Sequence, residues 1–156
     1  MKKLFIIGVF ALFVYACGNE KKETTDDAAP VEDAQKKADP SYDTNRGEGK
    51  FKDVKLADKL DNAMALRGEK IADLKCLSCH KLTDEKLVGP GWKGATTRHK
   101  PEWIMNFVTN TDVMIDKDPK AQAMLEICMV RMPNQNLDDA AARDVLEFLR
   151  KNDGVK

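Results

Sequence analysis

Residues 76–80 hold the side chains of this chain that are best arranged for chemistry. The segment is Cys76-Leu77-Ser78-Cys79-His80, two thiols three positions apart followed at once by an imidazole. Within one helical turn both sulfurs lie on the same side, where each could add to a vinyl group of one porphyrin. The adjacent histidine could then ligate the iron. The pattern C-x-x-C-H therefore predicts covalent attachment of one c-type haem.

Two other kinds of site use a pair of cysteines at this spacing. A zinc site would need a second pair of ligands downstream, where the chain offers only His99 and Cys128, far apart from each other. A thioredoxin-like dithiol would sit at the end of a strand in a βαβ unit, and no strand pattern surrounds residues 76–80. The sequence favours haem, with the zinc and dithiol sites as alternatives.

The N-terminus indicates export from the cytoplasm. Lys2 and Lys3 precede a short apolar run that ends at Ala16, as in a secretory signal peptide. Residues 14–17, Val-Tyr-Ala-Cys, resemble the lipobox of bacterial lipoproteins, which implies that Cys17 is lipidated and becomes the first mature residue. An ordinary signal peptide and an uncleaved anchor are the alternatives. We therefore expect a signal peptide over residues 1–16 and a periplasmic protein that is lipid-anchored to the inner or the outer membrane.

The composition changes at about residue 58. Residues 17–58 are rich in charged residues and poor in large apolar ones, so they bury too little surface to offset the entropy of ordering, and we expect a disordered linker. Residues 59–156 hold nearly all the large apolar residues and form one small domain. The whole chain has 26 basic and 26 acidic side chains, so no strong net field attracts a partner, and nothing suggests nucleic-acid binding.

Helical patterns occupy this domain, and no stretch alternates as a half-buried strand does. Apolar residues recur at helical spacing over residues 59–75. Pro101 and Pro119 stand at first-turn positions of two further helices, the second capped by Asp118 and ending near residue 129. Asn136 can cap a last helix that ends before Gly154. The predicted fold class is all-α.

The order of these features resembles a class I cytochrome c over roughly residues 62–153. It comprises C-x-x-C-H after a first helix, then Gly89-Pro90, Met132-Pro133 and a C-terminal amphipathic helix. In that family Cys76 and Cys79 would form the thioethers and His80 would be the proximal iron ligand. The resemblance implies that the Pro90 carbonyl accepts a hydrogen bond from His80 Nδ1, and that Trp92 packs beside the haem. It also implies that Gly68 lets the last helix cross the first closely, with Phe148 nearby.

The resemblance makes Met132 the sixth ligand, because it precedes a proline in a loop beyond the predicted helix. Met129 is the next candidate, while Met124 is expected to be core filler on that helix. His99 could instead give two histidine ligands, but it lies in a polar run and we expect it on the surface. Cys128 remains after the other three cysteines are assigned; we expect a small buried residue, with an intermolecular disulfide as the alternative.

An iron with both axial positions filled has no site for a substrate, so we expect an electron carrier rather than an enzyme. The expected partners are redox proteins: a respiratory donor and a terminal oxidase or exported reductase. A peroxidase-like enzyme, a redox or gas sensor with a labile sixth ligand, and a permanently docked subunit are the alternatives. The loop after His80 would offer a basic patch to an acidic partner if it rims the haem edge, and a mixed solvated surface otherwise; its basic residues are Lys81, Lys86, Lys93, Arg98 and Lys100.

Overall fold

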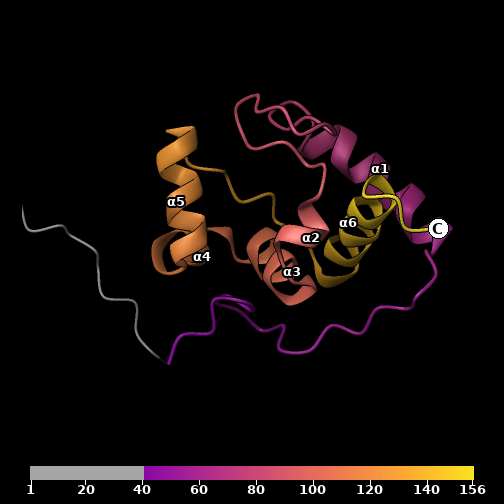
Figure 1. Ribbon diagram of the computed structural model, residues 1–156, viewed down its shortest axis with the longest axis horizontal. Coiled ribbons are helices and arrows are strands. Elements are labelled where there is room, and N and C mark those ends of the chain that lie inside the picture. Colours follow the sequence, from indigo (N-terminus) through magenta and orange to yellow (C-terminus); the bar gives the residue numbers. More distant parts are fainter. Residues whose placement is uncertain (1–40) are drawn as a thin grey trace, which may run out of the picture. The chain divides into compact units, whose positions relative to one another are not determined.

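The computed structural model describes residues 41–156, and in these the regular secondary structure is helix, with no strand. The signal peptide, Cys17 and residues 18–40 of the expected linker lie outside the described residues. The helices are α1 (Asn62–Lys75), α2 (Ala95–Arg98), α3 (Pro101–Thr109), α4 (Thr111–Lys117), α5 (Pro119–Cys128) and α6 (Asp139–Asn152) (Figure 1). None of these helices has the length and apolar character needed to cross a bilayer. The all-α prediction is confirmed.

The first and last helices cross at a glycine. A side chain at Gly68 of α1 would collide with the Asp144 carbonyl oxygen of α6 and would come within 2.9 Å of Phe148 Cβ. The absence of a side chain at residue 68 therefore lets the two helix backbones approach directly, and the expected packing of Phe148 at this crossing is present. The crossing fixes the end of α1, and the C-x-x-C-H segment begins at the next residue.

Helices α3 to α6 enclose the apolar core. Asp118 caps α5 as expected, its Oδ1 accepting from the Ala121 N–H at 2.9 Å. Helix α4, between α3 and α5, has no counterpart among the predicted helices. The core side chains of these four helices include Trp103, Ile104, Met105, Met114, Ile115, Val145, Leu146 and Leu149.

The predicted cap of α6 was wrong by two residues. Asp138, not Asn136, caps the helix, and its carboxylate accepts from the Ala141 N–H at 2.7 Å. Asn136 has a left-handed backbone (φ 51°), and its N–H is held by the Asn134 side chain in a local turn. A residue in that conformation cannot enter a helix as a cap, so the helix begins three residues later.

We call residues 42–57 the strap. The sequence predicts that this segment is part of a disordered linker, but the structure packs it on the domain. The side-chain amide of buried Asn106 donates to the carbonyls of Arg46 and Phe51 and accepts from the Phe51 N–H at 2.9 Å. The Val54 N–H donates to Glu102 at 2.8 Å. The strap runs past α3 and α6 towards the start of α1 (Figure 1). The packed unit therefore begins before residue 59.

Candidate haem-binding site

The C-x-x-C-H segment forms a tight turn at the end of α1. Cys76 is the C-cap residue of that helix, and the N–H groups of Cys79 and His80 both donate to its carbonyl at 3.0 Å. Cys76 is buried and Cys79 is partly exposed. Burial raises the pKa of the Cys76 thiol to about 11, so this sulfur is protonated at neutral pH. The turn places both sulfurs and the imidazole within one short stretch of backbone.

His80 is held by the loop that the resemblance singled out. Its Nδ1 lies 2.8 Å from the Pro90 carbonyl oxygen, as expected. The N–H groups of Val88 and Gly89 both donate to the Cys79 carbonyl, which ties the loop to the turn. A side chain at Gly89 would collide with the His80 ring, so glycine permits this close approach.

The protonation of His80 suits a metal ligand. Burial lowers its pKa, while the backbone hydrogen bond to Pro90 raises it, and the net shift is downwards. The neutral ring carries one N–H, and a carbonyl acceptor requires that N–H at Nδ1. The lone pair of Nε2 is therefore available to a metal, and the Pro90 carbonyl fixes the orientation of the ring.

Two adjoining cavities meet at His80. Their empty volumes, open solvent included, are about 590 and 770 Å³, in the range of cofactor pockets. Cys79 lines the first cavity and Cys76 the second. Their linings are mostly apolar, and the residues common to both are His80, Pro90, Phe107, Met124 and Met132. Because they share these walls, we treat them as one cleft with both cysteines at its edge.

The methionines of the region differ in where they lie. Met132 is partly buried and lines both cavities, together with His80. Met129 is 84 % exposed, has a left-handed backbone and lines neither cavity. Met124 lines both from α5, so it is a wall of the cleft. Cys128 lines the first cavity and is partly exposed, where we expected a buried residue.

The loop that carries Met132 is fastened to α4 through its neighbour. The Arg131 guanidinium lies 3.0 Å from the Asp116 carboxylate and donates to the Asp112 carbonyl at 3.1 Å. Both partners are exposed, so the ion pairs are weak individually. Together they orient residue 131 towards α4, and the next side chain turns into the cleft.

Comparison with known proteins identifies the family. Residues 65–153 match the sequence model of the family described as cytochrome c, which is more than half of the chain. The chain belongs to the cytochrome c family. It binds one covalent haem c and is an electron-transfer haem protein. The zinc and dithiol alternatives are thereby set aside.

Solved structures agree with this assignment. Cytochrome c from Rhodothermus marinus is 33 % identical, with a TM-score of 0.65 over 67 % of this chain and 90 % of that one. An engineered form of that protein, and the same form bound to a carbene intermediate, are each 32 % identical, with TM-scores of 0.64 and 0.61 and the same coverage. A search of curated proteins gave no match.

The cleft of this cytochrome c also contains polar groups suited to haem. Among the described residues, the buried side-chain nitrogens without a hydrogen-bond partner are His99 Nδ1 and Trp103 Nε1. Both residues line the second cavity, as does Arg98. Trp103 Nε1 always carries a hydrogen, and a buried N–H without an acceptor costs about 1–3 kcal/mol, so a missing acceptor is implied. The carboxylates of haem are acceptors of the right kind, and the residues present therefore fit the cofactor.

His99 is partly buried, where we expected a histidine on the surface. Its ring stacks on Trp103 with centroids 4.1 Å apart, and Trp103 stacks in turn on Phe107 at 4.9 Å. Burial and the charges of Arg98 and Lys120 lower the pKa of His99 to about 4, so the ring is neutral at pH 7. Sequence patterns do not indicate this stacking, because the polar neighbours of His99 resemble a solvated turn.

Trp92 packs between His80 and Phe148, while its expected contact with the haem stays a prediction. Its ring centroid is 5.3 Å from that of His80 and 6.4 Å from that of Phe148, and it lines the second cavity. The indole therefore links the helix crossing to His80. It supports the His80 ring by packing against it.

Proposed function

We propose that this cytochrome c is a membrane-tethered carrier of single electrons that works outside the cytoplasmic membrane. In this proposal Cys76 and Cys79 would hold the haem through thioethers, and His80 and Met132 would ligate its iron. When bound, the haem supplies one-electron oxidation and reduction, with a potential raised by histidine–methionine ligation. Respiratory redox proteins would be the donor and the acceptor.

The observation that carries this proposal is the lining shared by the two cavities. His80 and Met132 stand in the walls of both, while Met129 stands in neither. The Pro90 carbonyl keeps the imidazole oriented, and apolar walls that include Phe107 and Met124 exclude water. Two possible iron donors in one apolar cleft support electron exchange rather than substrate binding.

The absorption spectrum of the haem-loaded protein tests the ligand assignment. Methionine ligation of ferric iron gives a weak far-red band, and we expect Met132→Ala to abolish it. Met129→Ala is the matched control and should leave the band unchanged. A high-spin spectrum or rapid carbon monoxide binding in the unaltered protein would favour the sensor or peroxidase-like alternatives instead.

The anchor is proposed from the sequence alone. Supporting it are the positive start, the apolar run and the lipobox-like residues that end at Cys17. Metabolic labelling with a radioactive fatty acid should mark the full chain and should not mark a Cys17→Ser variant. A protein that carries haem but no label in either form would refute the anchor and leave the electron carrier intact.

A further inference from the structure

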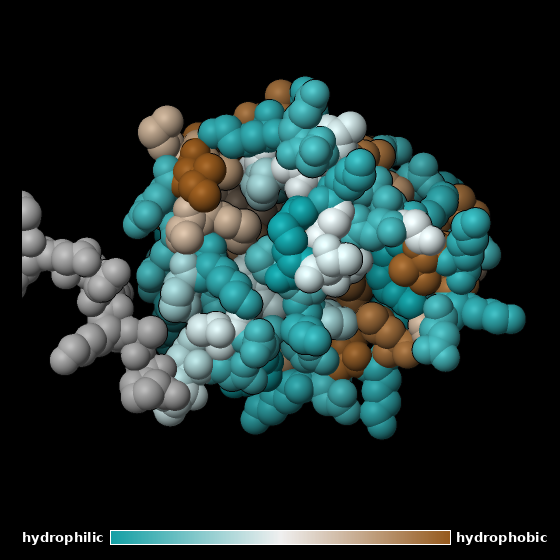
Figure 2. Space-filling model, viewed as in Figure 1, coloured by the Kyte–Doolittle hydropathy of each residue, from teal (hydrophilic) through white to brown (hydrophobic). Residues whose placement is uncertain are grey.

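The strap has an apolar face and a charged face. Phe51, Val54 and Leu56 are partly buried and pack against the core, while Lys52 and Lys55 between them are exposed. Figure 2, in the view of Figure 1, shows a mostly hydrophilic surface along the lower edge, where the strap runs. The strap is therefore packed on the domain through its side chains, although it contains no helix.

A buried amide on α3 holds the strap. Asn106 is fully buried, and its side chain makes three hydrogen bonds with the backbone of Arg46 and Phe51. The Gly49 backbone packs so closely on the same amide that a side chain at residue 49 would collide with it. Both N–H groups and the oxygen of this amide are thus satisfied by one segment, which fixes the register of that segment on the helix.

A second contact of the strap reaches Trp103, which lies one turn before Asn106 on α3. Gly47 has a left-handed backbone (φ 71°), and a side chain there would come within 3.1 Å of Trp103 Cδ1 and 2.7 Å of Met114 Sδ. The Glu48 N–H donates to the same sulfur at 3.0 Å. Glycine at residue 47 therefore lets the strap backbone pack directly against the indole and the methionine.

The strap touches the edge of the indole that carries its N–H. Cδ1 is bonded to Nε1 in the ring, and Nε1 is the buried nitrogen of Trp103 that has no acceptor among residues 41–156. Stacking between His99 and Phe107 restrains the tilt of the ring. The contact between Gly47 and Cδ1 restrains sliding of the ring in its own plane. Together these contacts determine where the N–H lies at the wall of the second cavity.

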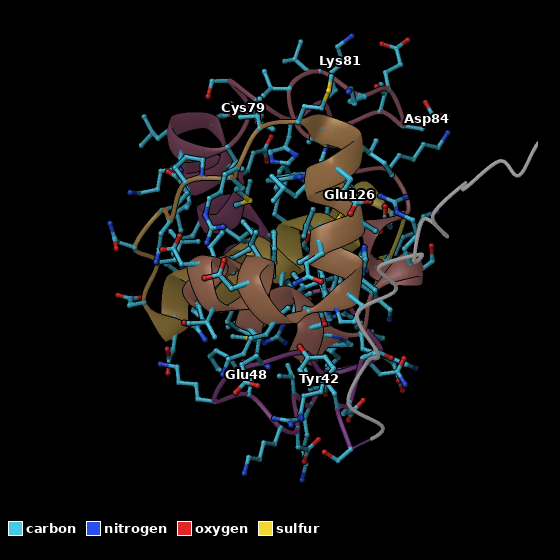
Figure 3. The ribbon with its side chains drawn as sticks, turned by 90° about the vertical axis from the view of Figure 1, so that its left-hand side faces the viewer. Tyr42, Glu48, Cys79, Lys81, Asp84 and Glu126 are labelled. Carbon is cyan, nitrogen blue, oxygen red and sulfur yellow. The ribbon has the colours of Figure 1, made fainter. Side chains whose placement is uncertain are left out.

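The strap is remote from the thiols that would hold the haem covalently. In Figure 3 Tyr42 and Glu48 lie at one end of the molecule, and Cys79 lies at the other. None of residues 42–57 lines either cavity, whereas Trp103 lines the second. A change in the strap can therefore reach the cofactor only through the side chains that separate it from the cleft, and Trp103 is one of these.

We propose that the strap sets the position of Trp103 and thereby raises the reduction potential of the haem. Gly47 and Asn106 are the positioning residues, and Trp103 is the residue that would meet a haem carboxylate. A hydrogen-bond donor at that carboxylate offsets its negative charge, which favours ferrous iron. This goes beyond the proposed function, because it gives residues 42–57 a part in setting the potential, whichever methionine ligates the iron.

Potentiometric titration of the full-length, haem-loaded protein tests this with Gly47→Ala. The added methyl group should displace the strap from the indole and weaken the placement of its N–H. The reduction potential should then fall by about 28 mV, which corresponds to about a threefold change in the one-electron equilibrium.

Gly154→Ala is the matched control for this change. Gly154 also has a left-handed backbone (φ 91°), but no atom lies within 4 Å of the position that a side chain would take. The control therefore introduces the same kind of backbone strain without a contact, and its potential should equal that of the unaltered protein. Equal shifts in the two variants would overturn the proposal.

Trp103→Phe separates positioning from a general loosening of the fold. It keeps an aromatic ring but removes the N–H, so the strap has no donor left to place. In this background Gly47→Ala should leave the potential unchanged, although it should still lower the free energy of unfolding, as it does when Trp103 is present. The same shift in potential in both backgrounds would mean that the strap does not act through the indole, and would overturn the proposal.

Asn106→Ala is a second variant that leaves residue 47 unaltered. It removes the amide that holds the Arg46 and Phe51 backbone, so the potential should again fall. The indole N–H signal of Trp103, identified by its loss in Trp103→Phe, should exchange faster with deuterated water than in the unaltered protein. Faster exchange with an unchanged potential would overturn the proposal.

Failure of this proposal is distinguishable from failure of the electron carrier. A Trp103→Phe protein with the potential of the unaltered protein would overturn the proposal at its first step and leave electron transfer intact. An unaltered protein without a reversible one-electron reduction would refute the carrier itself, and with it the role of the strap.

Discussion

The Tyr42 hydroxyl donates a 3.0 Å hydrogen bond to the Asp118 carboxylate, which joins two residues 76 positions apart. Asp118 is fully buried and also caps α5, the helix that leads to the Met132 loop. Burial and the Asp118 carboxylate raise the pKa of Tyr42, so its hydroxyl stays protonated and donates at every physiological pH. The strap is thus fastened to the helix that precedes the proposed sixth ligand.

Tyr42→Phe should therefore weaken both the fold and the methionine ligation. Removing a hydrogen bond to a buried carboxylate costs about 1.5–3 kcal/mol. We expect that loss in the free energy of unfolding, measured by denaturant titration, and loss of the far-red band at lower denaturant concentration than in the unaltered protein. Lys55→Ala, an exposed change in the same strap, should alter neither quantity. An unchanged Tyr42→Phe protein would show that the strap is not a support of α5.

The strap also shows where prediction from sequence stops. Local patterns sufficed for the C-x-x-C-H turn and the Asp118 cap, because neighbouring residues determine each. The Gly68 crossing was expected only from the family resemblance, since it depends on the distant residues Asp144 and Phe148. The order of residues 42–57 depends instead on contacts with distant buried groups such as Asn106, which composition does not record. His99 illustrates the same limit, since its burial results from stacking on Trp103 and not from its polar neighbours.

At the helix crossing, replacing glycine with alanine should lower stability, which is the opposite of its usual effect in a helix. In an exposed helix Gly→Ala stabilises by up to about 1 kcal/mol. Gly68→Ala should instead destabilise by about 1–3 kcal/mol, because the added methyl group would collide with the Asp144 carbonyl and force α1 and α6 apart. Thermal unfolding followed by circular dichroism measures the change. Lys70→Ala, at an exposed position of the same helix, should have little effect.

Acid stability should depend on Glu147. This buried carboxylate accepts from the Asp61 N–H at 2.9 Å and from Arg150 at 2.7 Å, and it pairs with Arg143. Burial raises its pKa, but these hydrogen bonds and charges outweigh burial and bring the pKa below its usual range. A carboxylate with a lowered pKa in the folded state stabilises fully above its unfolded pKa, about 4.3, and progressively less as the pH falls through the folded value.

Glu147→Gln should accordingly lower the free energy of unfolding by about 2–4 kcal/mol at pH 7. Below about pH 4.3, the stability of this variant should decrease less steeply with pH than that of the unaltered protein. Urea titrations at a series of pH values measure both effects. Glu69→Gln, which removes an exposed carboxylate paired with Lys151 at 3.1 Å, is the control and should change the profile little. An acid profile that stays as steep in Glu147→Gln would assign the dependence to another group.

Trp103 gives the sharpest test of how the cleft receives the haem carboxylates. Trp103→Phe keeps an aromatic ring between His99 and Phe107 but removes the unpartnered Nε1–H that lines the second cavity. Without that donor, the negative charge of a haem carboxylate is less well compensated, which favours ferric iron. The reduction potential should therefore fall, by up to about 60 mV, the equivalent of a tenfold change in a one-electron equilibrium. Potentiometric titration measures this, and an unchanged potential in a variant of unchanged stability would mean that the indole N–H faces no carboxylate.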